Sequence, residues 1–564
     1  MRKTTAGALL KVRAISGTHV VFLAFDMQRS DTEGLMGFAI QRADLTDDEV
    51  IWLRGNKTFA SIRPPTGFDD ASSREHPFQA FQWADYSAKP GYRYRYRVIP
   101  MFGQPGKLKP KGATSVTIGT EPLSAGKHDV HFNRGAISSQ AFTRRFPGQT
   151  LDQAGAPAYE WLGRDLVPAL LNFIAQANDS SCSLHAAIYE LHLPEGKPWP
   201  DVLAALKRAG QAGATVSLVY HGGDDDTGRA NLKAVTAAKI KGLSTPRSNA
   251  RLMHNKFIVF SKNGKPVSLW TGSTNISRNA LFGQLNFGHV VRDAALAGRF
   301  MAYWNELKAD PLHGALKDWA QTQNPLPPAG GVDGAAATTT PIFSPRRGRA
   351  VFDWWIALAD QPRPLFMTFP FGIVKDFRPV FDKSDGVLRF ALLDKYVNGG
   401  TPESRAAAIA DIERIRRRPN IGMALGSHIF VDWVDGWHQE AGGIGVNVNW
   451  IHTKFMLIDP LGSRPATLTG SANFSLASVE TNDENMLLIN GDKRVADIYF
   501  GEYMRLFAHH RFRESVKRHI DRFGAAAFNS WKPQDLFEDW QRWVPGHFRP
   551  GSEYDIKRRY FAGT

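Results

Sequence analysis

Residues 252–260 read Leu-Met-His-Asn-Lys-Phe-Ile-Val-Phe, and residues 450–459 read Trp-Ile-His-Thr-Lys-Phe-Met-Leu-Ile-Asp. In each stretch a histidine and a lysine stand two positions apart at the head of an apolar run. Successive side chains of a strand point to opposite faces, so the two polar groups share one face. The apolar run that follows predicts a buried strand of an α/β sheet.

Both stretches begin a longer repeat with an offset of 198 residues. A Gly-Ser-x-Asn segment starts eighteen positions after each histidine, and a polar residue follows thirty-two positions after it. The matching positions are His254 and His452, Lys256 and Lys454, Ser273 and Ser471, Asn275 and Asn473, and Asn286 and Glu484. A single His-x-Lys carries no information, but two copies with one fixed spacing indicate a duplicated unit.

This pattern resembles the signature of the phospholipase D superfamily, in which His-x-Lys, a following Asp and a Gly-Ser-rich segment occur once in each half. The second copy is complete and includes Asp459, whereas Ser261 stands where the first copy would carry its Asp. The resemblance implies that this Asp supports the structure and is not the nucleophile. The substitution therefore weakens the first motif without abolishing it.

The resemblance implies a phosphodiesterase centre built from both halves. One histidine attacks phosphorus to form a covalent phosphohistidine, and the other protonates the leaving oxygen. Lys256, Lys454, Asn275 and Asn473 clamp the phosphoryl oxygens, and Ser273 and Ser471 support the pocket edge as donors. The two lysines take the place of a metal ion, and no zinc or calcium pattern is present, so we predict neither metal nor cofactor.

The polar residues thirty-two positions downstream resemble the family's orienting carboxylates. On this basis Glu484 serves His452 and Asn286 serves His254. A carboxylate favours the imidazolium form more than an amide does. We therefore expect His452 to be the general acid and His254 the neutral nucleophile.

The surrounding chain predicts an α/β fold with a pseudo-twofold, phospholipase D-like region of two α/β halves, preceded by an all-β sandwich. The sandwich expectation rests on seven short apolar or alternating runs before residue 122. Residues 90–98 alternate strictly and resemble the tyrosine-corner strand of fibronectin type III domains. The predicted divisions are a fibronectin type III-like sandwich at 1–122, a first half at 125–323, a linker at 324–341, and a second half with a helical tail at 342–564.

The composition is compatible with several phosphate-rich partners. Of 564 residues, 69 are Lys or Arg and 54 are Asp or Glu, which gives a formal charge of +15. Such an excess favours acidic lipid headgroups, nucleic acid or other phosphodiesters, although a basic surface without a specific partner fits equally well. We expect a monomer acting on a phosphodiester substrate.

The chain contains no apolar stretch long enough for a membrane span, and residues 1–25 do not form a Sec signal peptide. The single Cys182 excludes an intrachain disulfide. We therefore expect a cytoplasmic or membrane-peripheral protein, while export without a signal peptide stays open.

Three functions remain in view because one fold serves many substrates. The preferred prediction is a phospholipase D-like hydrolase or transferase acting on phosphatidyl lipids at a membrane surface. The alternative is a nuclease or nucleic-acid phosphodiesterase with the same two-histidine centre. The third is a binding protein for anionic surfaces in which the centre is inactive.

Overall fold

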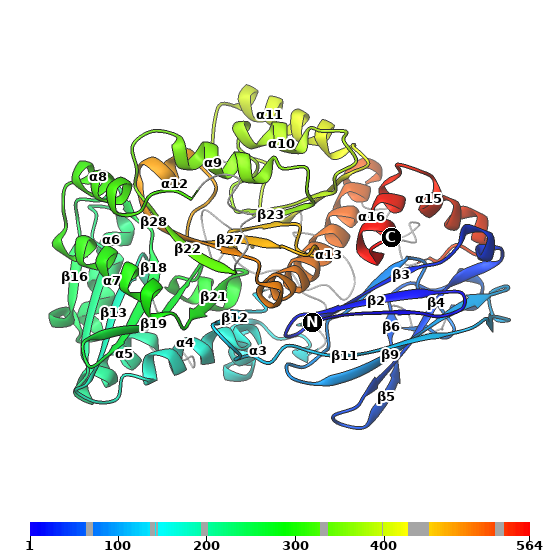
Figure 1. Ribbon diagram of the computed structural model, residues 1–564, viewed down its shortest axis with the longest axis horizontal. Coiled ribbons are helices and arrows are strands. Elements are labelled where there is room, and N and C mark those ends of the chain that lie inside the picture. Colours follow the sequence, from blue (N-terminus) through cyan, green and yellow to red (C-terminus); the bar gives the residue numbers. More distant parts are fainter. Residues whose placement is uncertain are drawn as a thin grey trace.

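The computed structural model describes residues 1–63, 71–135, 142, 145–192, 201–327, 337–397, 399–426, 450–524 and 535–564. Figure 1 shows three bodies of secondary structure: blue sheets, a cyan-to-green half and a yellow-to-orange half. The N-terminal region is all-β and the rest is α/β, as predicted. The described helices include none with the length and apolar character needed to cross a membrane.

Two larger antiparallel sheets and a two-stranded one, β6 (Arg54–Gly55) with β7 (Ala71–Ser72), form the described N-terminal region. A strand overlaps each of the seven predicted runs. The first sheet has the order β1 (Arg2–Ala6), β2 (Lys11–Ser16), β3 (Val21–Asp26) and β8 (Gln82–Asp85). The second has the order β10 (Lys109–Pro110), β9 (Arg93–Phe102), β4 (Leu35–Asp44) and β5 (Glu49–Trp52), and β11 (Thr114–Gly119) pairs with β9. On β9, Tyr94 and Tyr96 are buried while Arg93, Arg95 and Arg97 are exposed. The alternation of this strand therefore separates a core face from a solvent face.

The first α/β half is organised around one seven-stranded sheet. Its order is β12 (His128–Phe132), β21 (Phe287–Val291), β19 (Lys265–Gly272), β18 (Lys256–Lys262), β13 (Cys182–Ile188), β15 (Thr215–His221) and β16 (Ser244–Arg247). Its helices are α3 (Ala156–Gly163), α4 (Leu166–Ala175), α5 (Val202–Gln211), α6 (Asp226–Ala237), α7 (Ala294–Ala309) and α8 (His313–Gln323). The carboxylate of Asp201 accepts a hydrogen bond from the amide of Ala204 and caps the start of α5.

The second half repeats this sheet strand for strand. Its order is β22 (Thr338–Ser344), β28 (Asn482–Asn490), β27 (Ala466–Gly470), β26 (Phe455–Ile458), β23 (Leu365–Phe369), β24 (Arg389–Leu393) and β25 (Ile421–Leu425). In both halves the last three strands run parallel and the other neighbours antiparallel. The helices are α9 (Ala350–Ala359), α10 (Arg378–Phe381), α11 (Pro402–Arg416), α12 (Leu476–Glu480) and α13 (Lys493–Phe523). The duplicated sequence thus folds into two copies of one topology.

The predicted linker at 324–341 is partly wrong. Residues 338–341 belong to β22, which pairs with β28 and extends the second sheet. The Thr and Pro residues of this segment favoured a linker in the sequence. An edge strand tolerates proline, however, so the segment can still form β22. Residues 328–336 of the linker lie outside the described part of the chain.

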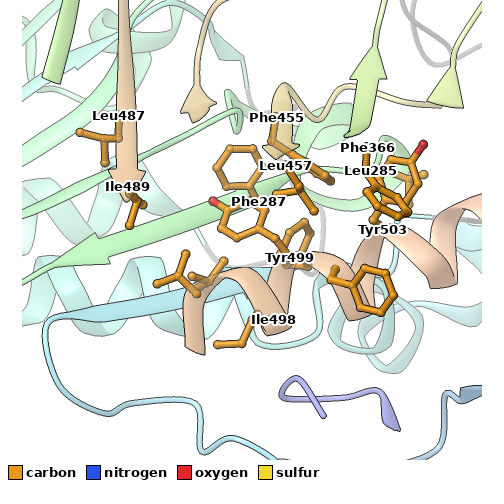
Figure 2. Packing of buried hydrophobic residues seen from close by; sticks show 14 of the residues in the cluster. Leu285, Phe287, Phe366, Phe455, Leu457, Leu487, Ile489, Ile498, Tyr499 and Tyr503 are labelled. Atoms are coloured by element: carbon orange, nitrogen blue, oxygen red, sulfur yellow. The ribbon is translucent and has the colours of Figure 1, made fainter. Parts of the chain in front are cut away.

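Helix α13 joins both halves in a single core. Tyr499 packs edge-to-face against Phe287 of the first sheet and Phe455 of the second, with ring centroids 5.6 and 5.2 Å apart. Figure 2 shows these rings together with Leu487 and Ile489 of β28. This shared core fixes the two sheets relative to one another, which the site between them requires.

The C-terminal segment, predicted as a helical tail of the second half, packs against the N-terminal sheets. Trp543 and Val544 join the hydrophobic core of these sheets, at the start of α15 (Val544–Phe548). The final helix α16 (Glu553–Ala562) bridges the two regions, because Phe561 contacts Phe22 of β3 and Phe390 of β24. Figure 1 shows this red segment beside the blue strands.

Candidate functional site

The residues just before each catalytic-motif histidine pair with the backbone of the opposite half. A short strand, β17 (Leu252–Met253), leaves the first half and pairs in parallel with β28 of the second. The amide of His254 then donates to the carbonyl of Asp483 at 2.9 Å. In the mirror arrangement the amide of His452 donates to the carbonyl of Leu285 at 3.2 Å. Each histidine is therefore held against the opposite half.

This exchange overturns the predicted pairing of the histidines with their polar partners. Nδ1 of His254 lies 3.0 and 2.9 Å from the two carboxylate oxygens of Glu484. Nδ1 of His452 lies 2.9 Å from Oδ1 of Asn286. The prediction that Glu484 serves His452 and Asn286 serves His254 is wrong, because the partner comes from the other half in both cases.

Both histidines line one cavity of about 1630 Å³. Each side chain is almost fully buried, with 5% of His254 and 7% of His452 exposed, so only an edge of each ring is accessible. Asn275 and Asn473, the asparagines of the two Gly-Ser-x-Asn segments, line the same cavity. The structure thus brings together four of the predicted site residues around a single space.

The two lysines lie deeper than the histidines. Nζ of Lys256 donates to the carbonyl of His254 at 2.6 Å, and Nζ of Lys454 donates to the carbonyl of His452 at 2.5 Å. Burial lowers the pKa of Lys256 to about 7, although Glu484 and Glu190 oppose this. Burial, reinforced by the charge of Lys256, lowers the pKa of Lys454 well below its usual range. A buried anion between the halves would restore the charged form of both lysines.

Burial favours the neutral form of both imidazoles. Burial lowers the pKa of His254 to about 4, even though the adjacent Glu484 raises it. Burial and the charges of Lys454 and Lys256 lower the pKa of His452 well below its usual value. Burial raises the pKa of Glu484, but its interaction and hydrogen bond with His254 and the charge of Lys256 outweigh burial, so the pKa of this carboxyl is lowered. The tautomer of His254 with its proton on Nδ1 follows, because Glu484 can only accept.

Ser273 and Ser471 were predicted at the edge of the pocket, but neither lines the cavity. Ser273 donates to Oδ1 of Asn286 at 2.8 Å and accepts from the amide of Phe287 at 3.2 Å. Ser471 accepts from the amide of Asn485 at 3.0 Å and donates to the carbonyl of the same residue at 3.2 Å. Both side chains are fully buried. They tie the Gly-Ser-x-Asn segments to β21 and β28, and Ser273 also orients the amide that serves His452.

The two asparagines differ in their contacts. Nδ2 of Asn275 donates to a carboxylate oxygen of Glu190 at 2.8 Å, which fixes the orientation of this amide. Oδ1 of Asn275 and Oδ1 of Asn473 are both buried without a hydrogen-bond partner. Unsatisfied buried polar atoms are rare in folded proteins, and their presence on both sides of the cavity marks it as a ligand site.

Asp459 and Ser261 lie at the far ends of their strands. Asp459 follows β26, has a positive φ of 45°, and lies 3.6 Å from the guanidinium of Arg363. Ser261 is buried near the end of β18, and its hydroxyl has no hydrogen-bond partner. Neither residue lines the cavity. The difference between the two motifs at this position therefore lies outside the catalytic space.

Several residues at the cavity were not predicted from the sequence. The ring of Tyr189 lies 5.0 Å from that of His254 and 4.9 Å from Nζ of Lys256. Glu190 holds Asn275, and Asp394 accepts from the amides of Trp450 and Ile451 ahead of the second histidine. All three follow the carboxyl ends of parallel sheet strands, a position where α/β folds place functional groups. Their position at the end of a predicted strand was the feature of the sequence from which these three residues could have been predicted.

The cavity lining also includes acidic and basic residues. The acidic residues are Glu190, Asp225 and Asp226 of the first half and Asp411 of the second, and the basic residues are Arg278 of the first half and Lys375, Arg378 and Arg405 of the second. The described residues hold no group of three or more His, Cys, Asp or Glu side chains arranged to bind a metal ion.

A family model described as "Cardiolipin synthase, PLD-like domain" matches residues 170–308 and 429–506 of this chain. These stretches contain both His-x-Lys motifs and both Gly-Ser-x-Asn segments. A comparison with curated proteins finds no match.

Among solved structures, phosphatidylserine synthase from Haemophilus influenzae Rd KW20 is 12% identical, with 64% of this chain and 92% of that chain covered and a TM-score of 0.41. Nuc from Salmonella typhimurium, a phospholipase D family member, is 19% identical, with 33% and 96% covered and a TM-score of 0.23. Polyphosphate kinase from Porphyromonas gingivalis is 11% identical, with 64% and 44% covered and a TM-score of 0.36, so this chain spans less than half of that kinase. These scores are too low to support a function. The family match shows that residues 170–308 and 429–506, which are less than half of the chain, are similar to a phospholipase D-like domain.

Proposed function

We propose that this protein is a metal-independent phosphodiesterase that hydrolyses or transfers phosphatidyl groups of lipids through a covalent phosphohistidine. The observation that carries the proposal is the pair His254 and His452 in one cavity, each with a different polar partner. Two imidazoles supply an attacking nitrogen and a proton donor, and two buried lysines supply the positive charge that a phosphodiester requires.

In the first step Nε2 of His254 attacks phosphorus and the bond from phosphorus to the leaving oxygen breaks. His452, protonated when the anionic substrate has entered, gives its Nε2 proton to that oxygen. In the second step His452 takes a proton from water or an acceptor alcohol, whose oxygen attacks phosphorus and breaks the bond to His254. His452 thus gives one proton in the first step and regains one in the second, and His254 returns to its starting form.

His254 remains the proposed nucleophile and His452 the proposed general acid, but the observed partners support these roles for a different reason. While the phosphohistidine exists, the ring of His254 carries a positive charge, and the carboxylate of Glu484 at 2.9 Å stabilises that charge. Asn286 is neutral, so it orients His452 without strengthening its hold on the proton. A weakly held proton suits a general acid that must protonate an alkoxide.

Lys256, Lys454, Asn275 and Asn473 are proposed to bind the non-bridging phosphoryl oxygens. Burial lowers the pKa of both lysines, and the negative charge of a bound phosphoryl group would raise it again. Ser273, Ser471 and Asp459 are proposed as structural supports, because their contacts are with the backbone or with the far end of the strand. No metal or cofactor is part of this proposal.

The rim of the cavity favours a lipid. Phe371, Val374 and Val397 are half-buried there, and Ile409 of α11 is 36% exposed beside the lining residue Ala408. Apolar side chains next to the exposed cations Lys375 and Arg405 suit an anionic membrane surface, where chains and headgroups meet.

A nucleic-acid phosphodiester is the second candidate. The exposed side chains of Lys375 and Arg405 have no hydrogen-bond or ion-pair partner among the described residues, and cations of this kind are typical contacts for a sugar–phosphate backbone. The same pair of histidines would perform the reaction on either substrate.

The N-terminal sheets are proposed to be a fibronectin type III-like module. Their strand order agrees with that fold, with β2, β3 and β8 in one sheet and β5, β4, β9 and β11 in the other. The hydroxyl of Tyr94 accepts from the amide of Lys89 at 2.9 Å, which is the contact of a tyrosine corner. The divisions at 1–122, 125–323 and 342–564, a monomeric state and a cytoplasmic or membrane-peripheral location belong to the same proposal.

The test offers phosphatidylcholine vesicles and, separately, single- and double-stranded DNA to the purified protein in the presence of a chelator. His254→Ala and His452→Ala are compared with His519→Ala, a matched change on α13 away from the cavity. Choline release that only the first two changes abolish supports the lipid function, and DNA cleavage with that dependence supports the second candidate. Binding without turnover of either supports the anionic-surface protein and refutes catalysis.

The roles of the histidines are tested by acid quenching and peptide mapping of the phosphorylated intermediate. Phosphate on His254 is expected, and accumulation of the adduct in His452→Ala would agree with loss of the group that takes a proton from water in the second step. Phosphate on His452 would reverse the assignment.

A further inference from the structure

A second cavity of about 710 Å³ lies between the N-terminal sheets and α13. Most of its lining is apolar or aromatic: Phe22, Phe78, Trp83, Trp161, Leu285, Met504, Leu506, Phe512 and Leu536. It shares no lining residue with the catalytic cavity, so the phosphodiester substrate does not account for it. Its volume is in the range of pockets that hold small organic ligands.

Four cations also line this cavity: Lys57, Arg134, Arg505 and Arg513. The described lining residues include no carboxylate. Arg505 is neutralised in part by Glu502 at 2.8 Å, but the side chains of Lys57 and Arg134 form no hydrogen bond or ion pair with any described residue. These two unpaired cations come from separate regions, one from the N-terminal sheets and one from the start of the first half.

The position of Arg134 is costly for an unpaired guanidinium. It stacks on the ring of Trp161 at 4.7 Å, and its Nε is buried without an acceptor. Burial, followed by repulsion from Arg164 and Arg505, lowers the pKa of Arg134 to about 10. The Arg134 side chain is half-buried, and a partly desolvated charge without a hydrogen-bond acceptor destabilises a fold unless an anion or a polar ligand compensates for it.

A third polar group on this cavity is also unsatisfied. His509 of α13 lines the cavity, and its Nε2 is buried without a hydrogen-bond partner. Burial and the charges of His510, Arg513 and Arg505 lower the pKa of His509 well below its usual value. Its neutral ring can donate a hydrogen bond to an anionic oxygen, as the two cations can.

We propose that this second cavity binds a small amphiphilic anion, an alkyl or aromatic body that carries one phosphate or carboxylate group. The anionic group pairs with Arg134 and Lys57 and accepts from His509, and the body lies against the Phe78 and Trp83 rings, which stack at 3.5 Å. Charge complementarity selects the anion, and the apolar walls select an amphiphile over a free inorganic ion.

The second cavity also contacts Leu285, which is hydrogen-bonded to the segment that carries His452. The side chain of Leu285 lines it, while the amide of Leu285 donates to the carbonyl of Trp450 at 2.7 Å and its carbonyl accepts from the amide of His452. A ligand in this cavity therefore packs against the residue that holds the second histidine strand in place.

Isothermal titration calorimetry with full-length His254→Ala protein tests the proposal, because binding here does not require catalysis. Dodecyl phosphate and dodecanoate separate the two possible head groups, and dodecanol and inorganic phosphate supply each part alone. One equivalent of at least one amphiphilic anion is expected to bind, at least tenfold more tightly than dodecanol or phosphate.

Arg134→Met in this background is expected to weaken binding of the anion by about tenfold or more while leaving dodecanol unchanged. Arg95→Met, an exposed arginine on β9, is the matched control and is expected to bind as the parent does. Lys57→Met, on the exposed loop, tests the same charge if Arg134→Met does not fold. Failure of both anions to bind, or equal affinities in the Arg134, Lys57 and Arg95 variants, would overturn the proposal.

Discussion

Lys256→Met is expected to make this protein more stable and inactive at once. The lysine is buried between the two halves, and burial lowers its pKa from 10.5 to about 7. One pK unit is worth about 1.4 kcal/mol, so below pH 7 the charged lysine costs the fold roughly 5 kcal/mol. Methionine has a similar length and no charge, so it removes this cost.

Part of the gain is offset by contacts that the substitution removes. Lys256 donates to the carbonyl of His254 at 2.6 Å and lies 4.9 Å from the ring centre of Tyr189. Losing both costs about 1 to 3 kcal/mol. The net increase in the free energy of unfolding is therefore about 2 to 4 kcal/mol at pH 6.

The sign of this effect depends on pH in a defined way. The pKa of Lys256 is lowered in the folded state, so the fold is penalised below that pKa and recovers as pH rises toward 10.5. At pH 9 the remaining cost is roughly 2 kcal/mol, which the lost contacts nearly cancel. The variant should thus be more stable at pH 6 and close to the parent at pH 9.

Urea unfolding followed by tryptophan fluorescence at pH 6 and pH 9, without added phosphate, measures this difference. Lys265→Met, an exposed lysine at the start of β19, is the control and should change stability by less than about 0.5 kcal/mol. A variant that is less stable than the parent at pH 6 would refute the view of Lys256 as a costly, unpaired charge held for an anion.

Further outcomes follow from the same contacts. The value of kcat/KM for a soluble phosphodiester should fall below about pH 4, where His254 becomes protonated, and above about pH 7, where Lys256 loses its proton; a flat profile would contradict these assignments. Asn286→Asp should raise the pKa of His452, measured by NMR of the imidazole nitrogens, because a carboxylate then replaces the amide at 2.9 Å; an unchanged pKa would argue against this contact. Tyr94→Phe should lower the stability of the N-terminal sheets by about 1 kcal/mol in urea unfolding, through loss of the bond from Lys89, and an effect no larger than that of Tyr92→Phe would count against a tyrosine corner.

The local spacing of the sequence was enough to predict the duplicated architecture. His-x-Lys at the head of an apolar run predicts a strand with both groups on one face, and β18 and β26 follow these motifs. The alternation of residues 90–98 predicted β9. These patterns act over a few residues, where backbone geometry alone decides which side chains lie together.

The pairing across the two halves was decided only by the tertiary structure. Glu484 lies 32 positions after His452 in the chain, yet it contacts His254, which is 230 residues away. Pairing of β17 with β28 places the two residues together, and no local pattern encodes which half an exchanged strand joins. Burial of Lys256 and the unpaired charge of Arg134 have the same origin, since both depend on which surfaces meet when the halves, α13 and the N-terminal sheets pack. The sequence therefore determined which groups are available for chemistry, and the docking of distant segments determined which of them face one another and how strongly each holds its proton.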